Sequence, residues 1–383
     1  MNVRQVRQVC RLIDKSYGRG SPGRSQEGNS MIRFTLGLIL VFVLCVPSLV
    51  AAEDGSPVAA SPVAASGDFA GLVDIGGGRH LYLECKGSGG PTVVLEAGYR
   101  SPATVWTDDI VQPENPRTMV LPGVAAFTRV CAYERPGTDG VVDGRPQPSR
   151  SDPVPMPRTA QSVVTDLHTL LHVAGIPDPY VLVGHSLGGL FVRLYASTYP
   201  DEVVGLVLVD AWSEKLHSLL IPEQWSSYVR LNSVIPPEMR NNAAYETLDF
   251  AAASAEMSTA ASAHPLRSMP VVVLSHTQPF GVPEEALGFP PELLEKAWSK
   301  AQDGLTTLVP NSQHIIATES GHYIQLQQPD LVITAIRQVV EAVRTPGRWA
   351  TPVTGRISMP SAEVDLGILQ GVSDPGRGRT RTT

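Results

Sequence analysis

Short apolar runs alternate with helical stretches from about residue 68 to residue 345. We predict strands at 81–85, 92–97, 129–134, 180–185, 204–210, 270–276 and 313–319, and helices at about 159–174, 187–199, 291–307 and 329–344. Several strand segments are continuously apolar, which is typical of parallel strands covered on both faces. The alternation predicts a doubly wound α/β fold, with a mostly parallel central sheet and helices on both of its faces.

One long segment, 211–268, does not follow this alternation of strands and helices. It contains many alanines and several bulky apolar residues but no strand pattern. We interpret it as an inserted helical cap over the carboxyl edge of the sheet. After the domain at 68–345, residues 346–383 are rich in Gly, Pro, Thr and Arg and predict a loosely ordered tail, although 364–369 could form a terminal strand.

The N-terminal region has the features of an export segment. Residues 1–52 carry seven basic and two acidic residues, and 34–52 carry no charge and end in Val-Ala-Ala. A short basic region, an apolar stretch and small residues before a cut are typical of a signal peptide. An uncleaved anchor is the alternative, because about 19 apolar residues can just span a bilayer. Residues 53–67 repeat SPVAA and predict a linker. We therefore expect an exported protein that is secreted, periplasmic or anchored facing outward.

Composition narrows the function classes. Hydrophobic residues make up 43% of the chain and charged residues 17%, which favours a packed core over disorder. The net charge is −7. An acidic folded body has no general attraction for nucleic acid, so we expect no nucleic-acid partner.

The strand 180–185 leads into the sequence Gly184-His185-Ser186-Leu187-Gly188-Gly189, which opens the next predicted helix. The pattern G-x-S-x-G is weak alone, but a serine on a tight strand-to-helix turn is held up at the sheet edge as an exposed nucleophile. Ser186 is therefore the predicted nucleophile.

The motifs VVLEAGY, CAYERPG, VLVGHSLGG, LVLVDA and ESGHYIQLQQP follow one another in the order typical of a known family. Over about residues 70–344 the chain resembles the α/β-hydrolase superfamily, and within it the esterase-type members with a helical cap. The resemblance implies that His322, after the last core strand, is the catalytic base. It also implies that the backbone N–H groups of Tyr99 and Leu187 form the oxyanion hole, although Ala97 stands where many relatives have His.

The catalytic acid is open to several assignments. The superfamily most often places it after the strand that follows the cap, where this chain offers only Glu284 and Glu285. Some members carry it one strand earlier, and Asp210 closes that strand here. An acid there lies at the same sheet edge as the nucleophile. We predict Asp210, with either glutamate or another carboxylate such as Asp303 as alternatives.

The resemblance also bears on the cysteines. In this fold the strands of Cys85 and Cys131 lie side by side, and these are the two cysteines left once a signal peptide is removed. Oxidising conditions outside the cell favour a bridge between them, so we predict a disulfide; two buried free thiols are the alternative.

The remaining histidines give no prediction of metal binding. His185 is interpreted as structural, and His168 and His172 as surface residues of a helix without chemistry. Four others have no partners at the spacing of metal ligands: His217, His264, His276 and His314. We expect neither a metal nor a dissociable cofactor.

Together these features predict an exported serine hydrolase that cleaves a small-molecule carboxylic ester or a related acyl bond through an acyl-enzyme. The same triad also catalyses the reactions of amidases, peptidases, acyltransferases, lactonases and carbon–carbon bond hydrolases. The sequence therefore leaves these activities as alternatives. A non-catalytic binding protein with a hydrolase fold is a further alternative. Residues 34–52 could tether the chain to a membrane.

Overall fold

The computed structural model describes residues 67–142, 145–236, 239–240, 242–347 and 349. The predicted leader and signal or anchor at 1–52, nearly all of the linker and the tail beyond 349, with its possible strand at 364–369, lie outside the described residues. Within the described part of the chain, no helix is both long and apolar enough to cross a membrane.

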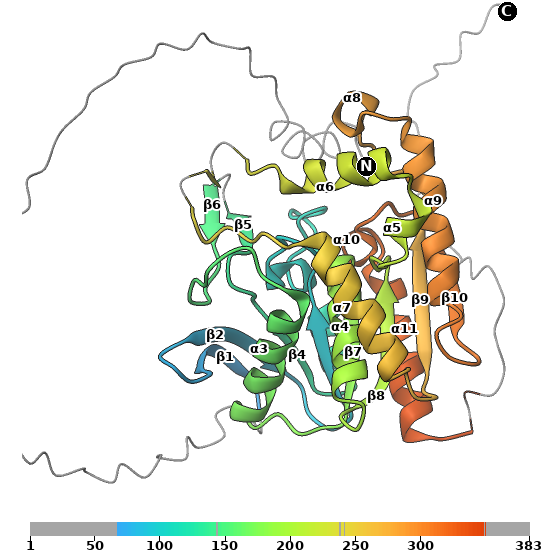
Figure 1. Ribbon diagram of the computed structural model, residues 1–383. Coiled ribbons are helices and arrows are strands. Elements are labelled where there is room, and N and C mark those ends of the chain that lie inside the picture. The colour runs from blue at the N-terminus through green and yellow to red at the C-terminus, as the bar shows by residue number, and fades with distance from the viewer. Residues whose placement is uncertain (1–66, 143–144, 237–238, 241, 348, 350–383) are drawn as a thin grey trace, which may run out of the picture.

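Eight strands form the central sheet in the order β1-β2-β4-β3-β7-β8-β9-β10 (Figure 1). They are β1 (Phe69–Asp74), β2 (His80–Lys86), β3 (Thr92–Glu96), β4 (Val130–Tyr133), β7 (Tyr180–His185), β8 (Val203–Val209), β9 (Val271–His276) and β10 (Gln313–Ala317). The pairs β1–β2 and β2–β4 are antiparallel, and the other pairs are parallel. The predicted doubly wound, mostly parallel fold is confirmed.

Two apolar layers cover the sheet. Helices α3 (Ala160–Val173), α4 (Leu187–Thr198), α7 (Phe250–Ala263) and α9 (Pro291–Leu305) pack on one face. The other face carries η1 (Ala103–Trp106), α2 (Val120–Ala125), α10 (Ile324–Gln327) and α11 (Pro329–Arg344). The four predicted helices therefore correspond to α3, α4, α9 and α11.

Three strands have no counterpart in the predicted set. In β1 only Val73 is buried, so its sequence lacks the apolar signal of the inner strands. The small hairpin of β5 (Asp139–Val142) and β6 (Arg145–Pro148) lies apart from the central sheet, in a segment that contains glycines and prolines.

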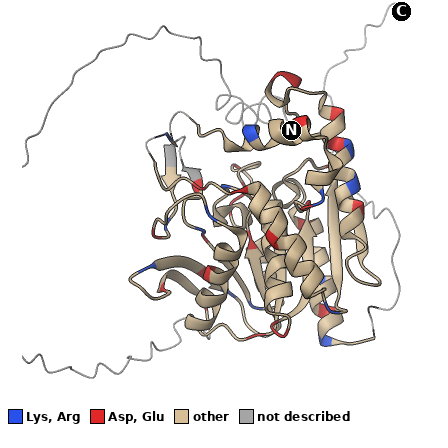
Figure 2. Cartoon of the chain, in the orientation of Figure 1, with Lys and Arg blue, Asp and Glu red and all other residues tan. Residues whose placement is uncertain are grey.

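The segment 211–268 divides into two parts. Helices α5 (Leu216–Leu219) and α6 (Pro222–Ser233) come first, and α6 contacts α8 (Glu284–Leu287) above the carboxyl ends of the strands (Figure 1). Helix α7 instead packs on α3 and α4 within the helical layer. Figure 2 shows acidic residues on α8 and charges of both signs along α9, whereas α4 and α7 carry few charges.

A disulfide joins Cys85 of β2 to Cys131 of β4. The two residues are direct partners in the antiparallel register of these strands. This is the pair that the sequence predicts, and it closes a loop with a sequence separation of 46 residues.

Candidate active site

Ser186 lies between β7 and α4 with φ 51° and ψ −124°, a backbone conformation that is strained for a residue with a side chain. The neighbouring glycines make this turn possible. A Cβ added at Gly184, Gly188 or Gly189 would come within 2.2–2.5 Å of an atom of the surrounding chain. The Ser186 side chain is partly exposed, and its hydroxyl makes no hydrogen bond with any residue that the structure describes. The Ser186 hydroxyl is therefore available to contact a ligand.

His322 follows β10 and lies beside the residue that precedes Ser186. Its ring centroid is 4.7 Å from that of His185, and its Nδ1 is 2.6 Å from Oδ2 of Asp210. An imidazole whose Nδ1–H donates to a carboxylate keeps its lone pair on Nε2. The structure thus brings His322 and Asp210 together, next to the Ser186 turn.

His185 has a definite structural task. Its side chain is buried, and burial, with the neighbouring His322, lowers the pKa of His185 to about 3. The neutral ring contacts the His322 carbonyl at 2.9 Å through Nε2, which must donate because a carbonyl only accepts. His185 therefore fixes the backbone of the loop that carries His322.

Asp210 directly follows β8 and is fully buried. Its Oδ2 accepts hydrogen bonds from His322 and, at 2.7 Å, from Nδ1 of His276, while its Oδ1 accepts one from Trp298 Nε1 at 3.1 Å. Burial alone would raise the pKa of this carboxyl, but the hydrogen bonds from the two histidines outweigh it and hold the pKa well below its usual range. Asp210 is an anion with its lone pairs occupied.

The alternative acids lie elsewhere. Glu284 and Glu285 are exposed in α8, and Asp303 is exposed on α9. Among the described residues, none of the three forms a hydrogen bond with His322.

His276 is the residue of this cluster that the sequence does not predict. It ends β9, where it contacts Asp210 through Nδ1 and Glu295 through Nε2, at 3.1 Å. Burial would lower its pKa, but hydrogen bonds with the two carboxylates outweigh this and raise the pKa of His276 to about 9. Its place at the carboxyl end of a predicted strand, beside the strand of Asp210, is the signal that could have revealed it. A cavity of about 360 Å³ borders His276, Glu295 and Trp298.

A buried ion-pair network holds the loop after β3. Arg135 donates to the backbone carbonyls of Ala97 at 2.8 Å and Gly98 at 2.6 Å, and it pairs with Glu96 and Glu246. All three charged side chains are at most 3% exposed. The sequence gives no indication of this role for Arg135, because its partners come from distant segments.

The same loop passes directly over Ser186. A Cβ at Gly98 would lie 3.2 Å from the Cβ of Ser186. Among the described residues, the backbone N–H groups of Tyr99 and Leu187 donate to no other protein group. Both donors are available for a negatively charged oxygen beside Ser186.

An aromatic cluster adjoins this turn. The Trp212 N–H donates to the Ser186 carbonyl at 2.7 Å, and Trp212 Nε1 donates to the Tyr228 hydroxyl at 3.0 Å. Phe250 packs against both of these rings and against Tyr99. The wall next to Ser186 is therefore largely apolar.

Within the part of the chain that the structure describes, two clusters contain three potential metal ligands whose ligand atoms lie within 4.8 Å of one another. One is Asp210, His276 and His322, in which each histidine already uses one nitrogen on the shared carboxylate. The other is His168, His172 and Glu202, which the structure brings together although the sequence predicts no chemical role for either histidine.

Comparison with known proteins places the chain in a family. A family model described as "Alpha/beta hydrolase family" matches residues 93–335. "Probable transporter efuK" of Hormonema carpetanum is 32% identical over 160 residues, which are 40% of this chain and 20% of that protein. "Uncharacterized protein YqjL" of Bacillus subtilis is 27% identical over 259 residues, 66% of this chain and 85% of that protein. A thermophilic esterase from Thermogutta terrifontis has a TM-score of 0.46 and 20% identity, with coverage of 73% of this chain and all of that one. This chain thus spans a fifth of the first relative's length and most of the second's.

Proposed function

The chain belongs to the alpha/beta hydrolase family, and we propose that it is a serine hydrolase that cleaves a carboxylic ester or a related acyl bond. The contact between His322 Nδ1 and Asp210 Oδ2, beside the strained Ser186 turn, is the observation that carries the proposal.

The proposed reaction uses each group for one task. The Ser186 hydroxyl attacks the acyl carbonyl while Nε2 of His322 accepts its proton. Buried Asp210 holds the ring in the correct tautomer and stabilises the imidazolium that forms. The N–H groups of Tyr99 and Leu187 stabilise the oxyanion. His322 then returns the proton to the leaving alcohol, and water attacks the acyl-enzyme by the same route in reverse.

The surroundings of the site support a substrate class. The aromatic wall of Tyr99, Trp212, Tyr228 and Phe250 favours an apolar acyl or alcohol group, because apolar surface gains free energy when it leaves water. We propose α6, which carries Tyr228 of this wall, and its neighbour α8 as the cap over the bound substrate.

Export also belongs to the proposal. The Cys85–Cys131 disulfide supports it, because such bridges persist mainly in oxidising compartments outside the cytosol. A signal peptide or anchor at 34–52 would provide the route.

Covalent labelling tests the proposal. A fluorophosphonate probe is expected to label the wild type at Ser186 and to leave Ser186→Ala unlabelled. Hydrolysis of p-nitrophenyl esters of graded chain length should fall about 10⁴- to 10⁶-fold in this variant, with unchanged circular dichroism. Ser262→Ala, which removes an exposed hydroxyl near the end of α7, is the matched control and should keep both signals. Labelling that persists in Ser186→Ala, or more than a tenth of the wild-type turnover, would contradict the proposal.

A further inference from the structure

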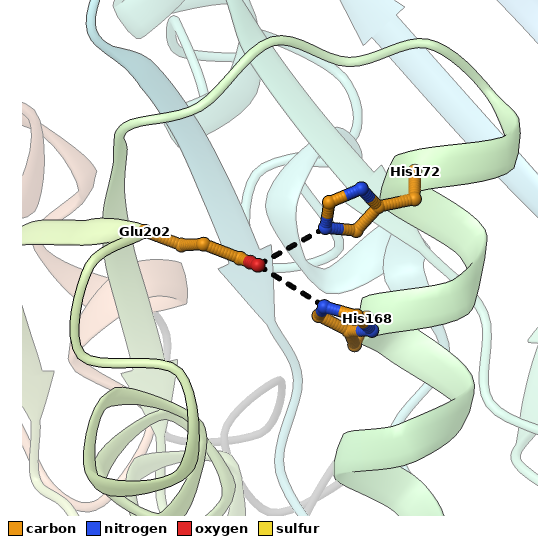
Figure 3. A group of neighbouring side chains, drawn as sticks. All are labelled: His168, His172 and Glu202. Carbon is orange, nitrogen blue, oxygen red and sulfur yellow. Dashed lines mark hydrogen bonds and ion pairs between the residues drawn. The ribbon is translucent and has the colours of Figure 1, made fainter.

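Two histidines and a glutamate converge at the edge of the domain opposite to Ser186. His168 and His172 are four residues apart near the end of α3, so they lie on the same face of the helix. Glu202 immediately precedes β8, whose other end leads to Asp210. Nε2 of His168 and Nε2 of His172 lie 3.0 and 3.1 Å from the same oxygen, Oε1 of Glu202 (Figure 3).

The side chains around this cluster hold its ligand atoms in place. The second oxygen of Glu202 accepts a hydrogen bond from the Tyr195 hydroxyl at 2.5 Å. The ring of His168 stacks on Tyr199, with centroids 3.8 Å apart. Partners of this kind orient metal-binding side chains in known sites, and changing them weakens the binding of the metal. The side chain of His172 is half exposed, so water can complete a coordination shell.

The donor set has a definite chemical preference. Two imidazole nitrogens and one carboxylate oxygen suit Zn²⁺ and its neighbours in the first transition row, whereas Ca²⁺ and Mg²⁺ prefer oxygen ligands alone. Oε1 of the Glu202 carboxylate lies within 3.1 Å of Nε2 of both histidines. An anionic oxygen between two imidazoles matches a divalent cation in charge as well as in geometry.

We propose that His168, His172 and Glu202 form a binding site for a divalent transition-metal ion, with Zn²⁺ as the best match. An ion there would join α3 to the start of β8 and thereby stabilise the fold. It would take no part in hydrolysis at the opposite edge of the sheet. Without an ion, the same contacts would be ordinary hydrogen bonds from two Nε2–H groups to Glu202, and the experiment must separate the two cases.

Cobalt is the direct probe, because Co²⁺ occupies zinc sites and absorbs visible light there. The full chain is treated with a chelator, freed of it and titrated with Co²⁺. We expect a visible absorption band that saturates at one equivalent and is abolished by Zn²⁺. The variant His172→Gln changes a half-exposed side chain and should fold normally, yet it should lose the band. His168→Gln/His172→Gln tests the pair together, and His264→Gln, an exposed histidine after α7, is the matched control.

Thermal unfolding gives a second, independent readout. Zn²⁺ at about a hundredfold excess over its dissociation constant should raise the melting temperature of the wild type by about 5 °C, because a ligand that binds only the folded state stabilises it. The His172→Gln variant should show no such rise, while Mg²⁺ should change neither protein. Ester hydrolysis by His172→Gln should equal that of the wild type.

Three results would overturn the proposal. The first is the absence of a cobalt band in the wild type, and the second is an equal response of the wild type and His172→Gln to Zn²⁺. The third is metal uptake that survives in the double variant and inhibits hydrolysis, which would place the ion at Asp210, His276 and His322 instead. None of these results depends on whether Ser186 is the nucleophile, so the two proposals fail separately.

Discussion

The protonation of His276 predicts how stability changes with pH. This side chain is 6% exposed and lies between Asp210 and Glu295, which raise its pKa to about 9. An unfolded histidine titrates near 6.5. The difference corresponds to about 3 kcal/mol of stability, at about 1.4 kcal/mol for each pH unit. Because the folded pKa is the higher one, this contribution is complete below about pH 6.5 and is lost as the pH rises through 9.

The variant His276→Asn isolates this contribution, because the asparagine amide can replace the Nδ1–H donor to Asp210 but carries no charge. The free energy of unfolding is measured by urea denaturation and tryptophan fluorescence from pH 6 to 10. We expect the wild type to exceed the variant most at pH 6, and the difference to shrink by about 3 kcal/mol by pH 10. Exposed His264→Asn is the control and should follow the wild type. A difference between the wild type and His276→Asn that is constant across this range would refute a protonated His276.

Three further changes test the site and the fold. Asp210→Asn should lower ester hydrolysis about 10⁴-fold, whereas Glu285→Gln should leave it unchanged; the opposite pattern in the kinetic assay would reassign the acid. Arg135→Met leaves two buried glutamates without their partner and should cost about 3–5 kcal/mol in urea unfolding, and a loss below 1 kcal/mol would contradict the network. Cys85→Ser/Cys131→Ser should cost about 4 kcal/mol, from the 46-residue separation that the bridge closes, and equal melting temperatures for this variant and the wild type would refute that estimate.

The central part of the fold could be predicted because its signals are local. The inner strands are continuous apolar runs, and Ser186 and Asp210 each stand where such a run ends. Strand β1 could not be predicted in the same way, because it buries only Val73.

The contacts of His276 and Arg135 depend on strand register and on long-range packing, which the local sequence pattern does not reveal. His276 meets Asp210 because β8 and β9 pair with Val209 opposite Leu274, and a shift in this register would separate them. Arg135 is buried because segments near residues 97 and 246 both converge on it. The periodicity of apolar residues predicts neither the register of β8 and β9 nor the meeting of distant segments at Arg135.

The disulfide also determines how the domain would respond to a mechanical load. A pull applied where β1 begins would first separate β1 from β2, because these strands form an antiparallel hairpin at the edge of the sheet. The peeling would then stop at Cys85, where the covalent bond to Cys131 transfers the force into β4. The chain between Phe69 and Cys85 could extend by at most about 60 Å, at about 3.5 Å for each residue. Strands β7 and β8, which lead directly into Ser186 and Asp210, lie farther along the sheet, so this edge could act as an extensible link while the geometry of the candidate site stays intact.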